Sequence, residues 1–343
     1  MINKAAYVTD KKHIEIKEHQ LQPVLSHEVR VQIKACGICG TDMHFYNTHT
    51  SKEPTPLGHE VAGIIVEVGR DVNDINVGSS VVVQNHVPCG VCKACSMRRA
   101  DLCSNIKTYM TDQAGLGSYL TVERNMVIEF SDLDYDQATL AEPITVAMDL
   151  FQEADIKKED SVLIMGPGVI GLALVYLAKL SGAAKVAVVG HNLTSTRGAY
   201  RAHVATVFGA KRVYDSSTQN WKEEVLRDYS HGFSKVIVTS PPKTIIDGIE
   251  LAGFGGYIVY DGISFSDDTI SFGANDFHFK KKRLIASHAI PNYGFPYALE
   301  LLKKAPILTQ LLLTHRYPFD ELIRGFEGYE DRDSKIIKTV VYM

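Results

Sequence analysis

Four of the six cysteines in this 343-residue chain stand close together, at a spacing that suits a metal ion. Thiolates at short spacings let one stretch of backbone wrap an ion, and structural zinc takes four ligands in a tetrahedron. An iron–sulfur cluster also uses four cysteines, and four unconnected cysteines are the remaining alternative. Because all four fall within 15 residues, the pattern favours a structural zinc. The predicted ligands are Cys89, Cys92, Cys95 and Cys103.

A second group of potential metal ligands precedes this loop. Cys39, His59 and Glu60 offer sulfur, nitrogen and oxygen atoms, and a catalytic zinc has three protein ligands and one open position. Two alternatives remain on these residues alone. Cys36 and Cys39 form a Cys-x2-Cys pair of the kind used in redox chemistry, and His59 can be a core histidine.

A glycine-rich loop connects an expected strand at 161–165 to an expected helix at 172–180. In this context glycines allow a tight turn and bring a pyrophosphate close to the start of the helix. The alternative is a plain turn between strand and helix. The predicted dinucleotide-binding residues are Gly166, Gly168, Val169, Ile170 and Gly171.

The residues after the next expected strand bear on the choice of cofactor. In NAD enzymes an acidic residue there binds the adenosine ribose, whereas this chain has Gly190, His191 and Asn192. No acid follows until Asp215. A 2′-phosphate is then not repelled, and arginine suits phosphate. We therefore expect NADP(H) to be preferred over NAD(H), with His191, Asn192 and Arg197 at the cofactor; the alternative is a solvated loop with loose specificity.

Composition and charge limit the remaining classes of function. The chain carries 36 Lys+Arg and 40 Asp+Glu, a net charge of −4, so we expect neither nucleic acid nor a membrane surface as a partner. The longest uncharged apolar run, 162–178, is short for a membrane span and is interrupted by glycine and proline. No secretory signal is visible, and clustered cysteines act as ligands where thiols stay reduced, which favours the cytoplasm.

The periodicity of the chain changes near residue 135. Before it, short segments alternate polar and apolar residues between glycines, which is typical of an all-β domain. After it, apolar strand-like runs alternate with helical segments, which predicts a parallel sheet covered on both faces.

Together these motifs resemble the zinc-dependent medium-chain dehydrogenase/reductase family, in particular its polyol (sorbitol-like) and threonine dehydrogenase branch. Three segments carry the resemblance besides the four-cysteine loop and the glycine loop. They are Cys39-Gly40-Thr41-Asp42, Gly58-His59-Glu60-x2-Gly63-x5-Gly69-x2-Val72 and Glu142-Pro143, with Leu313-Thr314-His315-Arg316 as a fainter late match. The resemblance covers nearly the whole chain.

The resemblance implies an α/β fold of two domains. A GroES-like β-barrel catalytic domain would span residues 1–148 and 290–343. A Rossmann domain, built on a doubly wound parallel sheet, would be inserted over residues 149–289. Oligomers are usual in the family, so a homodimer or homotetramer is expected.

The resemblance also implies a reaction: reversible oxidation of a secondary alcohol to a ketone, with two zinc ions per chain and a nicotinamide cofactor. Glu142 joins Cys39, His59 and Glu60 as a candidate ligand of the catalytic zinc, and Thr41 would relay the hydroxyl proton, with His44 as a possible continuation. A carboxylate in place of a third thiolate favours a small polyhydroxylated substrate such as a polyol, sugar or cyclitol. A threonine-type amino-alcohol dehydrogenase and a non-catalytic zinc and nucleotide-binding protein are the alternatives.

The chain departs from the family pattern at three places. Asp149 stands where many relatives have histidine, the stretch from Gly190 to Gly209 is longer than usual, and residues 280–283 form a cationic run. That run is interpreted as a solvated segment, with sugar-phosphate binding as the alternative. Packing is the expected role of the aromatic residues near the pocket, although lining it is possible for Phe45, Tyr46, Asn47, Asn292 and Tyr293. Cys36 has no assigned role.

Overall fold

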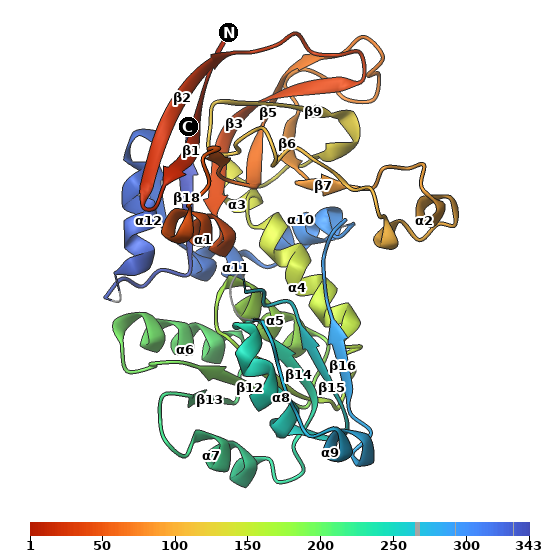
Figure 1. Ribbon diagram of the computed structural model, residues 1–343, viewed down its shortest axis with the longest axis vertical. Coiled ribbons are helices and arrows are strands. Elements are labelled where there is room, and N and C mark those ends of the chain that lie inside the picture. Colours follow the sequence, from red (N-terminus) through yellow and green to blue (C-terminus); the bar gives the residue numbers. More distant parts are fainter. Residues whose placement is uncertain (265–267, 292, 332) are drawn as a thin grey trace. The chain divides into compact units, whose positions relative to one another are not determined.

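The computed structural model describes residues 1–264, 268–291, 293–331 and 333–343. The chain forms two compact units (Figure 1). The first contains Met1–Thr145, Ile290–Asp331 and Lys338–Met343, and the second contains Val146–Ala289 and Arg332–Ile337.

The first unit is built mainly on antiparallel β-structure, with one parallel pair formed by Leu313–Pro318 and Lys338–Tyr342. One sheet has the order β2-β1-β4, and a larger one has the order β10-β6-β5-β3-β18-β17 with β9 also paired to β3. Alternating residues of these strands, such as Val29, Val31 and Ile33, are buried in a shared core, as strands with one solvated face require. The strands are β1 (Ile2–Asp10), β2 (His13–Gln20), β3 (Glu28–Ile38), β4 (Thr55–Pro56), β5 (Glu60–Val68), β6 (Ser80–Val83), β9 (Tyr119–Glu123), β10 (Val127–Glu129), β17 (Leu313–Pro318) and β18 (Lys338–Tyr342).

Short helices and one small hairpin complete this unit. Strands β7 (His86–Val87) and β8 (Lys107–Thr108) form a two-stranded antiparallel sheet that brackets the cysteine loop. The helices are α1 (Gly40–Thr48), α2 (Lys93–Ser96), α3 (Tyr135–Ala138), α10 (Phe295–Lys304), α11 (Pro306–Leu312) and α12 (Leu322–Glu330), with 3-10 turns at Ala100–Leu102, Arg124–Met126 and Phe319–Glu321.

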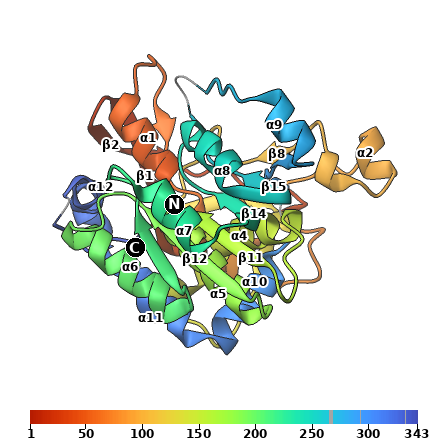
Figure 2. The same ribbon diagram turned by 90° about the horizontal axis from the view of Figure 1, so that it is seen from below.

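The second unit contains a six-stranded parallel sheet in the order β13-β12-β11-β14-β15-β16. Helices α5 and α6 lie on one side of this sheet, and α7 and α8 lie on the other (Figure 2). The predicted doubly wound sheet is therefore confirmed. The elements are β11 (Ser161–Met165), α5 (Val169–Leu180), β12 (Lys185–Gly190), α6 (Thr196–Phe208), β13 (Arg212–Asp215), α7 (Trp221–Asp228), β14 (Phe233–Val238), a 3-10 turn (Pro242–Thr244), α8 (Ile245–Leu251), β15 (Ala252–Tyr260), α9 (Ala274–Phe279) and β16 (Arg283–Ala286).

The strand order reverses between β11 and β14. In open parallel sheets, ligands bind outside the carboxyl ends of the strands at such a reversal. Helix α4 (Ala141–Glu153) begins in the first unit and continues into the second.

The division between the units differs from the expected domain boundaries in one segment. Residues 290–343 were expected to return entirely to the first unit, but Arg332–Ile337 belongs to the second. The Arg201 guanidinium donates a hydrogen bond of 3.0 Å to the carbonyl oxygen of Ile336, and Ile336 is fully buried. Within the described part of the chain, no helix is long and apolar enough to cross a membrane.

Candidate metal centres and nucleotide site

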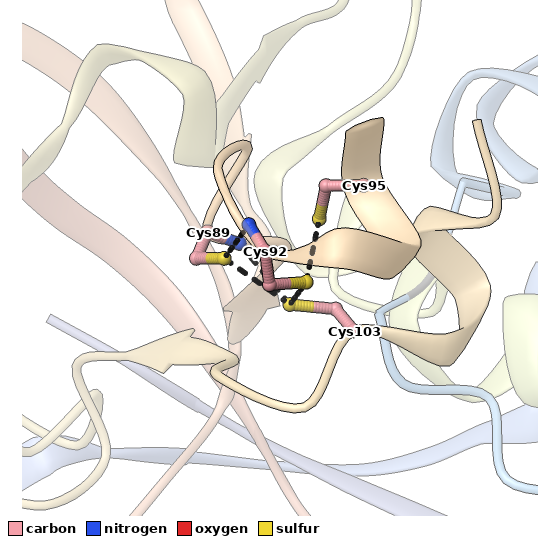
Figure 3. Close-up of side chains that lie close together, drawn as sticks. All are labelled: Cys89, Cys92, Cys95 and Cys103. Carbon is pink, nitrogen blue, oxygen red and sulfur yellow. Dashed lines mark hydrogen bonds between the residues drawn. The ribbon is translucent and has the colours of Figure 1, made fainter. Parts of the chain in front are cut away.

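The four cysteines of the predicted structural site lie together in the loop between β7 and β8 (Figure 3). Cys92 Sγ lies 3.5 Å from Cys95 Sγ and 3.9 Å from Cys103 Sγ, and Cys103 Sγ lies 3.6 Å from Cys89 Sγ. Four sulfurs bound to one zinc at about 2.3 Å stand about 3.8 Å apart. The spacing of these atoms therefore fits a tetrahedral zinc without rearrangement of the loop.

Backbone amides prepare this loop for thiolate ligands. The Cys89 amide donates to Cys103 Sγ at 3.3 Å, and the Cys92 amide donates to Cys89 Sγ at 3.4 Å. Hydrogen bonds from the backbone and from Cys95 lower the pKa of Cys92 to about 6. Desolvation raises the pKa of Cys95 to about 12, so a metal must displace the proton held there.

Loss of one of these ligands is expected to unfold the loop. A Cys95→Ser variant should retain one zinc fewer per chain and should lower Tm by at least about 5 °C, because a structural metal contributes its binding energy to folding. Metal analysis and thermal unfolding check this expectation. Ser96→Ala, at the neighbouring exposed position, is the matched control; equal zinc content in the two variants would contradict a structural metal.

The predicted catalytic ligands also come together, and in the first unit. Candidate ligand atoms of Cys39, His59 and Glu60 all lie within 4.8 Å of one another. Cys39 caps α1, while His59 and Glu60 stand at the start of β5. Asp42 joins the two segments, because its carboxylate accepts 2.8 Å hydrogen bonds from the amides of Cys39 and Gly58.

Two buried atoms in this cluster have no hydrogen-bond partner within the described parts of the chain. They are His59 Nδ1 and Glu60 Oε2, on side chains that are 5% and 0% exposed. Such atoms are costly to leave unsatisfied, and a bound cation would satisfy a carboxylate oxygen. Burial lowers the pKa of His59, but the charges of Cys39 and Asp42 outweigh it and raise that pKa well above its usual value. An excess of negative charge around His59 suits a metal ion.

Only one carboxylate oxygen of Glu60 is available to a metal ion, because a buried lysine binds the second oxygen. Lys338 Nζ donates to Glu60 Oε1 at 2.5 Å and to the carbonyl oxygen of Ile38 at 3.0 Å. Both charged side chains are at most 3% exposed. Sequence reasoning missed Lys338, whose only signal was a lysine within the apolar run at 336–341.

Glu142 lies beside this cluster, in the first turn of α4. Asn85 Nδ2 donates to Glu142 Oε1 at 3.2 Å. Burial raises the pKa of Glu142, and the charges of His59 and Glu60 also act on it. Glu142 is thus within electrostatic reach of His59 and Glu60, and Asn85 is a second contact that sequence reasoning missed.

The other residues predicted near this cluster have mixed positions. Thr41 and His44 are half-buried in α1, and His44 Nε2 lies 3.1 Å from Thr48 Oγ1; their relay role stays a prediction. Tyr46 is 5% exposed and packs on Phe326 in the core, in agreement with the expected packing role. Asn292 lies outside the described residues.

Cys36 is part of the core and is not exposed at all. Its thiol lies against Gly58, where an added Cβ would come within 2.8 Å of the sulfur. Burial raises the pKa of Cys36 well above its usual value. A buried, protonated thiol is unreactive, which argues against the Cys36–Cys39 redox pair.

The glycine loop of the second unit has the backbone that close approach of a phosphate requires. Gly166 adopts φ +107°, and a Cβ at Gly171 would lie 2.0 Å from the Gly166 carbonyl oxygen. A Cβ at Gly168 would meet no atom within 4 Å, which leaves open space at the start of α5. The Thr239 hydroxyl donates to the Gly166 carbonyl oxygen at 2.9 Å.

A cavity of about 680 Å³ lies along this loop and the carboxyl ends of β12 and β14. Five predicted cofactor residues line it: Gly166, Gly168, His191, Asn192 and Arg197. The other three, Val169, Ile170 and Gly171, are outside the lining, because they form the first turn of α5 behind the loop. Lys243 and Arg201, which were not predicted as cofactor-binding residues, also line the cavity.

Asp215 fixes the backbone of two residues that line this cavity. Its carboxylate accepts hydrogen bonds from the amides of Asn192 at 3.0 Å and Leu193 at 2.8 Å. Burial opposes its charge, but these amides and Ser217 keep the pKa of Asp215 below its usual value. Asn192 is thereby held at φ +56°. The first acid after Gly190 therefore fixes the loop backbone.

The cationic run at 280–283 is less solvated than expected. Lys282 is 6% exposed, and its Nζ donates to the Ile249 carbonyl oxygen at 2.5 Å. Asp276 pairs with Lys280 at 2.9 Å. Part of the positive charge of this run is therefore paired or buried inside the second unit. The interpretation of the run as a solvated segment was wrong for Lys282.

Two carboxyl groups of the second unit interact: Asp149 is in α4, and Asp261 directly follows β15. Ser287 Oγ donates to Asp149 Oδ2 at 2.6 Å, while Asp261 Oδ1 is buried and has no hydrogen-bond partner among the residues that the structure describes. Burial, with a smaller contribution from the charge of Asp149, raises the pKa of Asp261 to about 7. Asp149, which stands where many relatives have histidine, thus accepts a hydrogen bond from a neighbouring hydroxyl.

Stability should therefore fall as pH rises toward 7. The unfolded Asp261 loses its proton near pH 3.9 whereas the folded one keeps it to about 7, so folding becomes less favourable across that window. Asp261→Asn should raise the free energy of unfolding by roughly 1–3 kcal/mol at pH 8 and leave it nearly unchanged at pH 4. Urea unfolding at both pH values measures this. Asp74→Asn, on an exposed side chain, is the control; a pH-independent effect of Asp261→Asn would contradict the assignment.

Comparisons with known proteins agree with this geometry. Residues 25–132 match the alcohol dehydrogenase GroES-like domain, and residues 169–304 match the zinc-binding dehydrogenase family. L-Galactonate-5-dehydrogenase of Escherichia coli K12 is 28% identical over 96% of this chain and 96% of its own length. L-Threonine 3-dehydrogenase of Pyrococcus horikoshii is 30% identical over 89% of this chain and 86% of its own length.

A solved structure agrees as well. A protein from Sinorhizobium meliloti, described as a zinc-binding dehydrogenase bound to NADP, has a TM-score of 0.87 and 26% identity, covering all of both chains. Both domain families, the extended sequence similarity and the shared fold lead to one assignment. The chain belongs to the zinc-dependent medium-chain dehydrogenase family.

Proposed function

We propose that this protein interconverts a secondary alcohol and a ketone, with zinc and a nicotinamide cofactor, and that its substrate is a polyol, a sugar or a derivative of one. The observation that carries the proposal is the buried group of Cys39, His59 and Glu60, whose unpartnered polar atoms suit a metal ion. The similarity to L-galactonate-5-dehydrogenase over almost the whole chain supports the substrate class.

The residues of the first unit would hold the catalytic zinc. Cys39 and His59 are ligands in this proposal, and the third is Glu142 or the free oxygen of Glu60. When bound, zinc supplies a Lewis acid that lowers the pKa of a substrate hydroxyl, and the nicotinamide supplies a hydride acceptor. Lys338 holds Glu60 in place, and Asn85 orients Glu142. Thr41 would take the hydroxyl proton toward solvent.

The second unit would hold the cofactor. Gly166 and Gly168 leave room for the pyrophosphate at the start of α5. We propose that NADP(H) is preferred over NAD(H), because Gly190 stands where an acid would repel a 2′-phosphate and Arg197 lines the same cavity. A second zinc in the four-cysteine loop is structural in this proposal.

Two further properties belong to the proposal. We propose a homodimer or homotetramer, in keeping with the exposed edge that β16 leaves on the six-stranded sheet. We also propose the cytoplasm as the place of action, because the ligand cysteines must stay reduced.

One experiment tests the function. Purified protein is analysed for zinc and then assayed with polyols, sugar phosphates and amino alcohols, each with NADP and with NAD. The proposal expects two zincs per chain, turnover of polyols or sugar derivatives, and higher kcat/KM with NADP. Preferential oxidation of L-threonine would instead favour the amino-alcohol function of the Pyrococcus horikoshii relative. A single zinc without turnover would indicate a binding protein.

A further inference from the structure

One carboxylate lines the nucleotide cavity of the second unit. Among the described residues along that cavity, Asp247 is the single acid. The cationic residues there are Arg197, Arg201 and Lys243. The two arginines stand in α6, whereas Asp247 stands in the first turn of α8. Because a carboxylate only accepts hydrogen bonds, its side of the cavity suits a donor, while the arginines suit phosphate.

The carboxylate of Asp247 is held in place through one of its two oxygens. Lys222 Nζ donates to Asp247 Oδ1 at 2.8 Å and to Glu250 Oε2 at 2.7 Å. Within the described parts of the chain, the hydrogen bond to Lys222 is the one that the Asp247 side chain makes, and that side chain is 30% exposed. The second oxygen is therefore available to a ligand in the cavity.

An aromatic side chain lines the same cavity and is linked to this carboxylate through Lys222. Trp221 is the first residue of α7 and is 8% exposed. Lys222 Nζ, which binds Asp247, lies 5.9 Å from the centroid of the Trp221 ring. A flat indole surface together with one hydrogen-bond acceptor suits a flat heterocycle that carries an amine.

The parts of NADP(H) divide among the residues that line the cavity. The pyrophosphate belongs at Gly166 and Gly168, before α5, and the ribose with its 2′-phosphate belongs after β12, at residues 192–197. The adenine base is the part of the adenosine half that remains, and the remaining lining includes Trp221 and Asp247. Adenine is a flat heterocycle with an exocyclic amine, which is the chemistry that these two side chains suit.

We propose that the available oxygen of Asp247 accepts a hydrogen bond from the exocyclic amine of the cofactor's adenine, with Trp221 against the base, and that this contact selects adenine over hypoxanthine. The inference rests on the nucleotide site of the proposed function and deepens it. Hypoxanthine carries a carbonyl oxygen in place of the amine, and a carboxylate repels that oxygen. A site built to bond an N–H group discriminates against the analogue that lacks it.

The test compares NADPH with reduced nicotinamide hypoxanthine dinucleotide phosphate, which differs from it in the base alone. Dissociation constants of both are measured by calorimetry for the wild type and for Asp247→Asn. We expect the wild type to bind NADPH about tenfold or more tightly, because the analogue loses a hydrogen bond to a charged acceptor. Asparagine offers an N–H donor as well as an acceptor, so the variant should bind the two dinucleotides within about twofold of each other.

Trp221 supplies a second readout, because it is the only tryptophan of the chain. Adenosine 2′,5′-bisphosphate carries the base and the 2′-phosphate but no nicotinamide, so any change that it causes in the fluorescence comes from the adenosine half. We expect its binding to change the fluorescence of Trp221 in the wild type. Binding that calorimetry detects without such a change would contradict the placement of the base against the indole.

Glu250→Gln is the matched control. Glu250 binds the same lysine from the same helix, one turn beyond Asp247, but it is not among the described residues that line the cavity. Each of the two variants leaves Lys222 with one carboxylate partner, so the effect of a weakened ion pair is common to both. Glu250→Gln should keep the preference of the wild type for adenine.

Three affinity results would overturn the inference. A wild-type preference for NADPH below about twofold contradicts it without any variant, so the test does not depend on the folding of Asp247→Asn. An unchanged preference in Asp247→Asn contradicts it directly. An equal loss of preference in Asp247→Asn and Glu250→Gln would assign the effect to the ion pair of Lys222 instead.

Failure of the proposed function gives different results. A protein that binds neither dinucleotide refutes the nucleotide site, and the inference with it. A protein that binds NADPH in preference to the analogue but oxidises no alcohol of the wider panel refutes the proposed reaction and leaves the role of Asp247 supported.

Discussion

Replacing Cys39 with serine is expected to lower kcat/KM at least about a thousandfold while leaving NADPH affinity within twofold of the wild type. The reason is the separation of the two sites along the chain: Cys39 belongs to the first unit, and every residue lining the nucleotide cavity belongs to the second. Serine is a poor zinc ligand at neutral pH because its hydroxyl stays protonated. The measurements are steady-state kinetics, zinc analysis and NADPH binding by fluorescence.

Cys36→Ala provides the matched control for this prediction. It removes a thiol three positions earlier, on a side chain that is fully buried in the core. We expect that variant to keep both zincs and most of its activity, with some loss of stability from the cavity it creates. If both substitutions abolished turnover while each variant still bound two zincs, a redox pair of Cys36 and Cys39 would explain the loss better than a catalytic zinc at Cys39. Full activity in dialysed Cys39→Ser protein would reject a zinc ligand at this position.

Substituting Lys338 with methionine is expected to produce the largest loss of stability, about 3–5 kcal/mol in zinc-free protein. Lys338 and Glu60 form an ion pair with both side chains almost completely buried. Removing the ammonium group leaves the Glu60 carboxylate charged in a place without water, which is far more costly than losing an exposed pair. The charge of Glu60 raises the pKa of Lys338, although burial opposes it, which agrees with a strongly coupled pair.

Bound zinc should reduce the loss of stability in Lys338→Met. A zinc ion beside Glu60 would neutralise the negative charge of the carboxylate in place of the Lys338 ammonium group. The free energy of unfolding is therefore measured with and without zinc. Lys12→Met is the control, since Lys12 pairs with Glu330 at 2.7 Å on an exposed surface, where water and salt screen the pair and its loss should cost far less stability. A Lys338→Met variant as stable as Lys12→Met would show that the buried pair contributes little. An equal loss with and without zinc would argue against a metal at Glu60.

The four-cysteine loop and the glycine loop could be predicted from the sequence, because the local backbone alone brings their atoms together. The four cysteines are positioned by one loop. The glycine loop needs only the strand before it and the helix after it, β11 and α5. The alternation of apolar strands with helices likewise predicted the parallel sheet. Each of these inferences depends on residues near one another in the chain, where spacing constrains distance.

The prediction was less complete where a residue's partner lies far away in the chain. Arg197 reached the cavity as expected, but the first acid after Gly190 was assigned no function from the sequence. The structure shows that Asp215 holds the amides of the loop after Gly190. Periodicity could not reveal this contact, because it depends on how β12 and β13 are paired.

What the sequence determined by itself was the set of ligand types: thiolates for one zinc, and a cysteine, a histidine and carboxylates for another. Only the tertiary structure decided which side chains bind the two carboxylates. Lys338 reaches Glu60 across 278 positions, and Asn85 reaches Glu142 across 57. The physical reason is burial: a charge or polar atom removed from water must find its partner in three dimensions.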